Sequence, residues 1–443
     1  MFGYLGGAEL PFALKPGAQP PLVIAFQILP LVIVFSALSA LLWHWGVLRW
    51  IAGALVMQGL LAVLIVRVPA VWAAVGLVNN AVSAVEAATL KGSSYMFGYL
   101  GGAELPFALK PGAQPPLVIA FQILPLVIVF SALSALLWHW GVLRWIVNGL
   151  SFLLRRSLGV SGVVGLSGGA SVFLGVVEAP LVTRAYFGKV SRSELFQIMT
   201  LTMATISGAI LILYATTLRA VVPDAVGHMI SASLISLPAA LLIARLMVPQ
   251  SAEDAATEVD GEDTAGEGGL RYESSIDAII KGTLDGMQLF LAVIAVIITV
   301  FALVALVDMA LAATTLSVEG EPLSLKRMLG WALAPFMWLL GVPWGEAQAA
   351  GGLMGTKAVL NEYVAYLELA ALAPGTLGPR ATLIVTYALC GVANLASVGL
   401  LVSTIGTLAP ERRAEAAGLG MKSWIAGNLA SAMTGAWIGL VTW

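Results

Sequence analysis

The feature that most constrains this chain is a series of long apolar stretches that carry almost no charge. Asp, Glu, Lys and Arg make up 10% of the 443 residues, against about 25% in an ordinary soluble domain. A water-soluble fold cannot hide so much apolar surface, whereas roughly 20 apolar residues suffice to cross a bilayer. The sequence therefore predicts an all-α polytopic membrane protein with the lipid bilayer as its solvent. About eight transmembrane helices are expected near 21–48, 51–79, 116–150, 196–218, 225–247, 286–316, 381–408 and 421–443.

Two further apolar regions, 158–187 and 331–360, differ from these spans. Both are rich in glycine, both are interrupted by a proline, and each carries one acid near its middle. Irregular backbone at membrane depth persists only where it is buried in protein or lines a wet cavity. We therefore expect both regions to form re-entrant helical hairpins.

The order of spans and hairpins occurs twice along the chain. A span, a hairpin and two spans cover 116–247, and the same order covers 286–443. Three spans are an odd number, so the second set is expected to lie upside down relative to the first. An inverted repeat with broken segments at matching positions is typical of secondary transporters, with the binding site where the hairpins meet.

Residues 1–51 are identical, letter for letter, to residues 96–146. We interpret 1–51 as a copy that takes the place of the first scaffold span. The remaining parts are expected to be scaffold helices at 52–150, a first transport half at 151–249, an acidic linker with a connecting helix at 250–285, a long scaffold helix at 286–316 and a second transport half at 317–443.

Several function classes are disfavoured by composition and motifs. The net charge of −2 offers no basic surface for nucleic acid. The sequence has three histidines and one cysteine without a local cluster, which leaves little for a transition metal. Neither a zinc-protease motif nor a nucleophile elbow occurs, so the chain is not expected to be an enzyme and no organic cofactor is expected.

Glu178 and Glu346 are the two acids inside the predicted hairpins. A carboxylate at membrane depth is costly and tends to persist where it binds something, and carboxylates accept hydrogen bonds from substrate hydroxyls. We expect the hairpins to bring both acids to one wet pocket. The alternative is that each acid lies at the interface or is neutralised by a neighbour.

Two pairs of small polar residues offer further contacts. Asn394 and Ser397 are three apart, which places them on one helix face; they could bind substrate or form hydrogen bonds between helices. Ser171 and Thr205, with nearby backbone carbonyls, could hold a small hard cation. The alternative for this second pair is helix packing through small residues.

Three runs resemble the concentrative nucleoside transporter family. They are VVEAPLVTRAYFGKVSRSELFQIMTLTMATISG (176–208), GVPWGEAQAAGGLMGTKAVLNEYVAYLEL (341–369) and CGVANLASVGLLVSTIGTLAPERR (390–413). The resemblance implies a homotrimer in which each protomer has a scaffold part and a mobile transport part. It also implies nucleoside import driven by a sodium or proton gradient.

The resemblance also assigns residues. It places Glu178 beside the base, and Glu346 with Asn394 and Ser397 at the ribose. It places Ser171, Thr205 and the backbone of Leu174 and Ile206 at a sodium site. This chain departs from familiar members at Val176 and Val177, where Gln-Thr is usual, at Val392, where an aromatic is frequent, and at Ser171, where Asn is common.

From these observations we expect a multi-pass carrier of the bacterial inner membrane that imports nucleosides with sodium or protons by alternating access. The apolar base half predicts loose base discrimination, because it lacks an amide and a hydroxyl that could read a base. The alternatives are a carrier for a nucleobase or modified nucleoside, and a passive channel.

Overall fold

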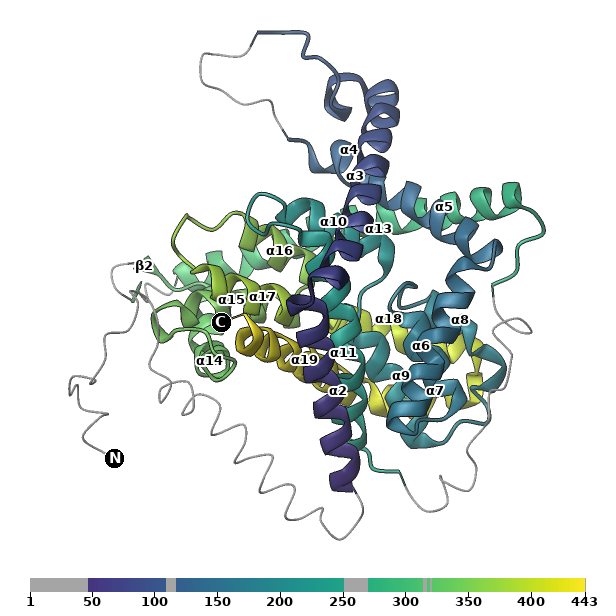
Figure 1. Cartoon of the computed structure of the whole chain (residues 1–443). Coiled ribbons are helices and arrows are strands. Elements are labelled where there is room, and N and C mark those ends of the chain that lie inside the picture. Colours follow the sequence, from purple (N-terminus) through teal and green to yellow (C-terminus); the bar gives the residue numbers. More distant parts are fainter. Residues whose placement is uncertain (1–46, 109–116, 251–269, 314–316, 319–320, 443) are drawn as a thin grey trace, which may run out of the picture.

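The computed structural model describes residues 47–108, 117–250, 270–313, 317–318 and 321–442. Among these residues the regular secondary structure is helical apart from one pair of two-residue strands, β1 (Ser317–Val318) and β2 (Glu321–Pro322). The predicted span 21–48 and the copy 1–51 lie outside the described residues except for their last few positions, as does most of the acidic linker. The all-α prediction is confirmed (Figure 1).

Six helices or continuous helix pairs among the described residues are long and apolar enough to cross a membrane. They are α2 (Val47–Arg67), α4 (Ile119–Gln122) with α5 (Pro125–His139), α9 (Arg192–Ala204) with α10 (Gly208–Leu218), α11 (Ala225–Met247), α13 (Ser275–Ala313), and η5 (Pro410–Arg412) with α19 (Arg413–Val441). The remaining helices before α13 are α3 (Pro69–Phe97), η3 (Gly98–Gly101), α6 (Val142–Leu158), α7 (Gly162–Ser171), α8 (Glu178–Val182) and η4 (Arg184–Tyr186). Those after it are α14 (Leu325–Leu339), α15 (Trp344–Val359), α16 (Glu362–Ala370), α17 (Pro379–Leu389) and α18 (Leu395–Leu408).

Several predicted boundaries were wrong. The span 51–79 is divided at Pro69, which begins α3, because proline cannot donate the helical hydrogen bond. The span 116–150 ends at His139, and Gly141, with φ 81°, precedes the separate helix α6. The domain boundary at 150/151 therefore falls inside α6, and the boundary at 285/286 falls inside the continuous helix α13.

The same order of elements occurs twice in the structure. Repeat 1 runs from α5 to α11, and repeat 2 runs from α13 to α19. Each repeat contains a helix broken in its middle, at 205–207 in repeat 1 and at 390–394 in repeat 2. The predicted span 381–408 is thus two short helices, α17 and α18, neither of which is long enough to cross the membrane alone.

The second predicted hairpin lies one helix too early. Its residues form α14 and α15, which are bent by 117° at the Gly341–Pro343 break. In repeat 1 the predicted hairpin 158–187 is α7, an irregular tip at 172–177, and α8. Its counterpart in repeat 2 is α15, the turn at 360–361, and α16. That turn contains neither glycine nor proline. The glycine and proline at 341–343 therefore placed the predicted hairpin at the earlier break.

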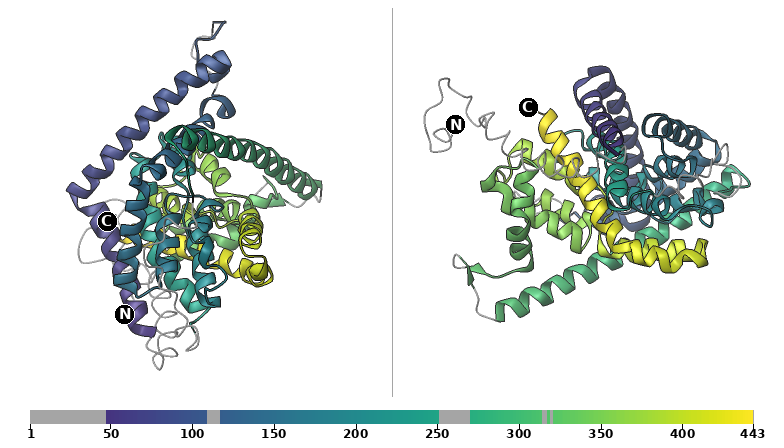
Figure 2. Two further views of the ribbon diagram at one scale, coloured as in Figure 1. Left: turned by 90° about the vertical axis from the view of Figure 1, so that its right-hand side faces the viewer. Right: turned by 90° about the horizontal axis from the view of Figure 1, so that it is seen from below.

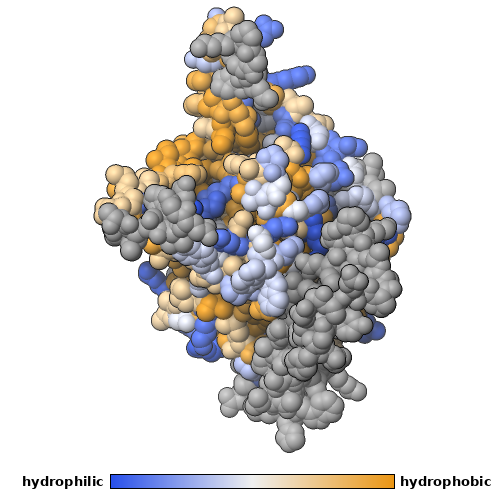
Figure 3. Space-filling model, turned by 90° about the vertical axis from the view of Figure 1, so that its left-hand side faces the viewer, coloured by the Kyte–Doolittle hydropathy of each residue, from blue (hydrophilic) through white to orange (hydrophobic). Residues whose placement is uncertain are grey.

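Close helix contacts fix the frame around these hairpins. Gly282 and Gly286 bring α13 against α5, since a Cβ at either position would lie 2.7 Å from an α5 atom. Both α13 and α3 extend beyond the compact bundle (Figure 2). Large apolar side chains are exposed along α13, including Ile298 and Leu306 at 66% and 60%. Hydrophobic side chains also cover broad areas of the face in Figure 3, as expected where lipid is the solvent.

Replacing Gly351 with Ala is expected to destabilise the protein by about 1–3 kcal/mol, the usual cost of overpacking. The added Cβ would lie 2.6 Å from the Gly330 carbonyl oxygen and 2.9 Å from the Ala334 nitrogen, which are backbone atoms of α14. The measurement is the thermal unfolding midpoint of the detergent-solubilised protein. Gly345→Ala is the matched control, because no atom lies within 4 Å of the position that its added methyl group would take. Equal midpoints for both variants would contradict this packing.

Candidate functional site

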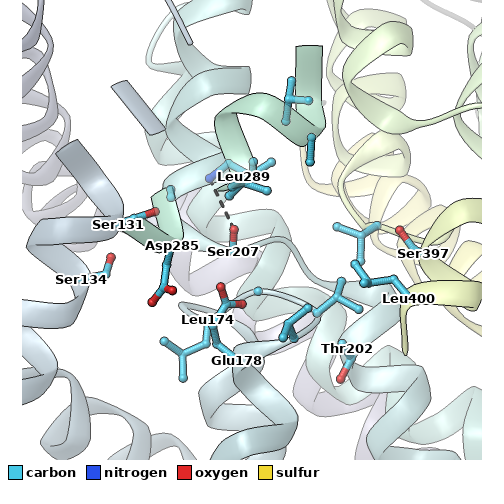
Figure 4. Close-up of a pocket in the computed structure, with 18 of the residues that line it drawn as sticks. Ser131, Ser134, Leu174, Glu178, Thr202, Ser207, Asp285, Leu289, Ser397 and Leu400 are labelled. Carbon is cyan, nitrogen blue, oxygen red and sulfur yellow. Dashed lines mark hydrogen bonds between the residues drawn. The ribbon is translucent and has the colours of Figure 1, made fainter. Parts of the chain in front are cut away.

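A cavity of about 300 Å³ lies where the two repeats meet. Its wall includes the hairpin tip of repeat 1, the breaks of both divided helices, the start of α16, and the facing helices α5 and α13. Figure 4 shows Ser131, Ser134 and Asp285 on one side of it and Ser397 and Leu400 on the other, with Glu178 between them. Concave sites of this size with a few polar groups are typical of small-molecule binding.

Glu178 reaches the cavity because α7 ends early. Ser161 caps the start of α7 by accepting a hydrogen bond from the Val164 amide, and the helix ends at Ser171. The chain then runs irregularly until Glu178, the first residue of α8. A carboxylate at the first turn of a helix is favoured by the unpaired amides there. Val176 and Val177 line the cavity beside it, so this end is apolar apart from its acids and serines.

Glu362 occupies the same position in repeat 2, as the first residue of α16. Asn361 caps that helix by accepting a hydrogen bond from the Val364 amide at 2.8 Å. The Glu362 carboxylate accepts hydrogen bonds from the Tyr214 hydroxyl at 2.6 Å and from the Asn394 amide nitrogen at 2.8 Å. Its side chain is buried and lines the cavity. Each hairpin thus delivers one carboxylate to the shared space.

Asn394 uses both ends of its side chain. Its amide nitrogen donates to Glu362, and its carbonyl oxygen caps α18 by accepting from the Ser397 amide at 2.8 Å. Ser397 and Val392 also line the cavity. The two broken helices touch here, because the Val392 amide donates to the Thr205 carbonyl at 3.2 Å. The structure therefore brings together the predicted substrate residues of repeat 2, apart from Glu346.

Of the residues predicted to hold a cation, Ser171 and Leu174 lie at the end of α7 and in the hairpin tip, and Thr205 and Ile206 lie at the repeat 1 break. Ser171, Leu174 and Thr205 line the cavity, whereas Ile206 is buried behind it. The Ser171 hydroxyl donates to the Gly168 carbonyl and the Thr205 hydroxyl donates to the Leu201 carbonyl, both at 2.9 Å. Each hydroxyl oxygen keeps lone pairs that can face a cation. Oxygen ligands of this kind suit a small hard ion such as sodium.

The prediction that Glu178 and Glu346 share a pocket was wrong for Glu346. The Glu346 carboxylate accepts a hydrogen bond from the Gly378 amide at 2.8 Å, near the start of α17, and does not line the cavity. The Glu346 carboxylate is stabilised by the amide at a helix start; the alternative interpretation was that each acid lies at the interface or is neutralised by a neighbour. Spacing could have found the right acid. Glu178 precedes Ser207, the N-cap of α10, by 29 residues; Glu362 precedes Asn394, the N-cap of α18, by 32, and Glu346 precedes it by 48.

Several further polar residues that line the cavity were not predicted from the sequence, among them Tyr214, Asp285, Ser131 and Ser134. Tyr214 is on α10, and Asp285 is on α13 opposite Glu178, where the two acids repel. Ser131 and Ser134 are on α5 beside Asp285 (Figure 4). An acid directly before a long apolar span was the available signal for Asp285. Nothing in the sequence pattern distinguished Tyr214 or the serines from packing residues.

Comparison with known proteins adds three family matches. The family described as Na+ dependent nucleoside transporter matches with its C-terminal part at 228–439 and its N-terminal part at 28–100. The family described as nucleoside recognition matches at 120–221.

Similar proteins align along most of the chain. An uncharacterized transporter of Haemophilus influenzae is 35% identical over 89% of this chain and 91% of its own length. The nucleoside permease NupC of Helicobacter pylori is 31% identical over 78% of this chain and 82% of its own. The structure of CNTnw in an inward-facing substrate-bound state superposes with a TM-score of 0.83 at 32% identity, covering 96% and 99% of the two chains.

These matches extend over both repeats and over the helices that enclose the cavity. The chain therefore belongs to the concentrative nucleoside transporter family, and it is a polytopic membrane transporter rather than an enzyme.

Proposed function

We propose that this protein imports nucleosides across the bacterial inner membrane by alternating access, coupled to sodium or protons. The observation that carries the proposal is the pair of carboxylates, Glu178 and Glu362, that the two hairpins present to one cavity. Ionised carboxylates accept hydrogen bonds from hydroxyl donors, and a ribose supplies such donors. Broken segments at membrane depth are the usual sites of substrate and ion in secondary transporters.

The two ends of the cavity suit different parts of a nucleoside. Glu362, Asn394 and Ser397 form a polar end that suits the ribose hydroxyls. Val176 and Val177, which directly precede Glu178, line the other end with it, and their apolar side chains suit the flat face of a base. We place the ion at Ser171 and Thr205, with the carbonyls of Leu174 and Ile206, and we infer a homotrimer from the family.

The runner-up substrates are nucleobases and modified nucleosides. The apolar side chains of Val176 and Val177 favour acceptance of several bases, because neither can select a base by hydrogen bonding. A passive channel is the remaining alternative, and accumulation of substrate against its gradient in liposomes excludes it.

Glu362→Gln is expected to lower kcat/KM for nucleoside uptake into proteoliposomes at least tenfold. The change removes the charge that strengthens hydrogen bonds to ribose hydroxyls, and it replaces one of the two acceptor oxygens that Tyr214 and Asn394 contact with an N–H donor. Glu346→Gln is the matched control and is expected to stay within about twofold, since Glu346 lies outside the cavity. A larger loss in the control than in Glu362→Gln would overturn the assignment of the second acid.

Thr205→Val is expected to raise the half-saturating sodium concentration at least fivefold. Valine keeps the shape but removes the oxygen that we assign to the ion. Substrate KM at saturating sodium should change little. The measurement is uptake as a function of sodium, with a parallel series under a proton gradient. An unaltered sodium dependence in a parent that does respond to sodium would remove Thr205 from the ion site.

Uptake of uridine, cytidine, adenosine and guanosine is expected to differ by no more than about tenfold in kcat/KM. The side chains of Val176 and Val177 cannot hydrogen-bond a base, so they do not contribute the larger discrimination that unpaired polar groups create. Val177→Thr, which adds one hydroxyl at nearly constant shape, should widen the differences among the four. Strict selectivity of the parent protein for one base would contradict this prediction.

A further inference from the structure

Lys357 is a cation that the proposed transport site does not use. It lies in the last turn of α15, and its side chain is fully buried, with 0% exposure. Its ammonium donates hydrogen bonds to the Ala388 carbonyl at 2.9 Å and to the Ser431 hydroxyl at 2.6 Å. A buried charge within a membrane protein is expensive and calls for a function.

The ammonium sits at the end of a helix where one carbonyl, that of Ala388, lacks its helical partner. Ala388 is next to last in α17, and the helical donor for its carbonyl would be the Val392 amide. That amide donates instead to Thr205 of repeat 1. The C-terminal end of a helix carries partial negative charge. Lys357 supplies both the missing hydrogen bond and the opposite charge.

The internal repeat gives this position a counterpart. Helix α15 corresponds to α7, and α17 corresponds to α9. In repeat 1 the ends of α7 and α9 carry Ser171 and Thr205, the candidate cation ligands. The segments 162–177 and 193–208 contain no Lys or Arg. The same junction of hairpin and broken helix thus has a built-in cation in repeat 2 and only oxygen ligands in repeat 1.

We propose that Lys357 is a tethered cation that holds the repeat 2 hairpin in place, as an exchangeable cation holds the repeat 1 hairpin. It fixes the end of α15 against the end of α17. Glu362 follows it by five residues, and its carboxylate attracts the ammonium. Asn394 follows Ala388 across the break and binds Glu362. Lys357 is thus a positioning residue for the Glu362–Asn394 pair, an inference that rests on the ion site proposed above.

The first test is Lys357→Gln, which keeps a hydrogen-bond donor, one bond shorter than in lysine, but removes the charge. Nucleoside affinity, measured by calorimetry on protein in detergent, is expected to fall at least tenfold. The matched control is Lys281→Gln, because Lys281 is half-exposed on α13 and pairs with Asp277; its affinity should be unchanged. Parent-like affinity in Lys357→Gln would overturn the proposal, because hydrogen bonding alone would then suffice.

The second test asks whether a free cation can replace the tethered one. Lys357→Ala opens a space at the end of α17, and methylammonium or added sodium should recover part of the lost affinity, whereas choline should not. Equal affinity in all three salts would mean that the lysine acts only by packing, which would overturn the proposal. If this variant binds no nucleoside, its unfolding midpoint in the same salts is the readout, with a higher midpoint in methylammonium expected and equal midpoints overturning the proposal.

The sodium dependence of the parent protein separates this inference from the proposed function. A parent that binds nucleoside equally with and without sodium would remove the exchangeable site of repeat 1. The loss in Lys357→Gln and its rescue in Lys357→Ala would still report on the tethered cation of repeat 2.

Discussion

The structure depends on how backbone groups are satisfied where helices stop inside the apolar bundle. Each unpaired amide or carbonyl at that depth costs several kcal/mol, so a broken helix survives only with a specific partner. Here the broken segments provide hydrogen-bond partners for one another. The Val392 amide donates to the Thr205 carbonyl of the other break, and the Gly208 amide donates to the Phe173 carbonyl of the hairpin tip. The polar cavity is therefore a consequence of the breaks. The segments that meet to satisfy their backbone groups also bring their carboxylate and hydroxyl side chains together.

The internal repeat explains why two acids meet. Glu178 and Glu362 are each the first residue of the helix that follows a hairpin turn, where free amides favour a carboxylate. The two repeats nevertheless differ in the residues that surround these acids and the helix ends. Glu362 is held by Tyr214 and Asn394. Lys357 occupies the helix junction that in repeat 1 has only oxygen ligands, so the two junctions differ in charge although they share an architecture.

The facing helices α5 and α13 close the cavity from the other side. Glycines at 282 and 286 allow the two helices to approach closely, and this contact brings Ser131, Ser134 and Asp285 to the wall opposite Glu178 (Figure 4). Glu178 therefore faces side chains of α5 and α13, whereas Glu362 is held by Tyr214 of α10 and by Asn394, the N-cap of α18.

The sequence alone determined that lipid is the solvent, that the fold is helical and that one order of elements occurs twice. It also identified Glu178, Asn394 and Ser397 as candidate site residues. Apolar length and rare polar groups are local properties of the chain, which is why they can be recognised without a structure. The sequence misplaced the second hairpin and selected Glu346, since Gly341 and Pro343 marked a break more visibly than the turn at Asn361. Tyr214, Asp285 and the role of Lys357 followed only from tertiary structure. The roles of these three residues depend on contacts between segments far apart in the sequence. No local sequence pattern distinguishes such a buried hydrogen-bonding partner from a packing residue.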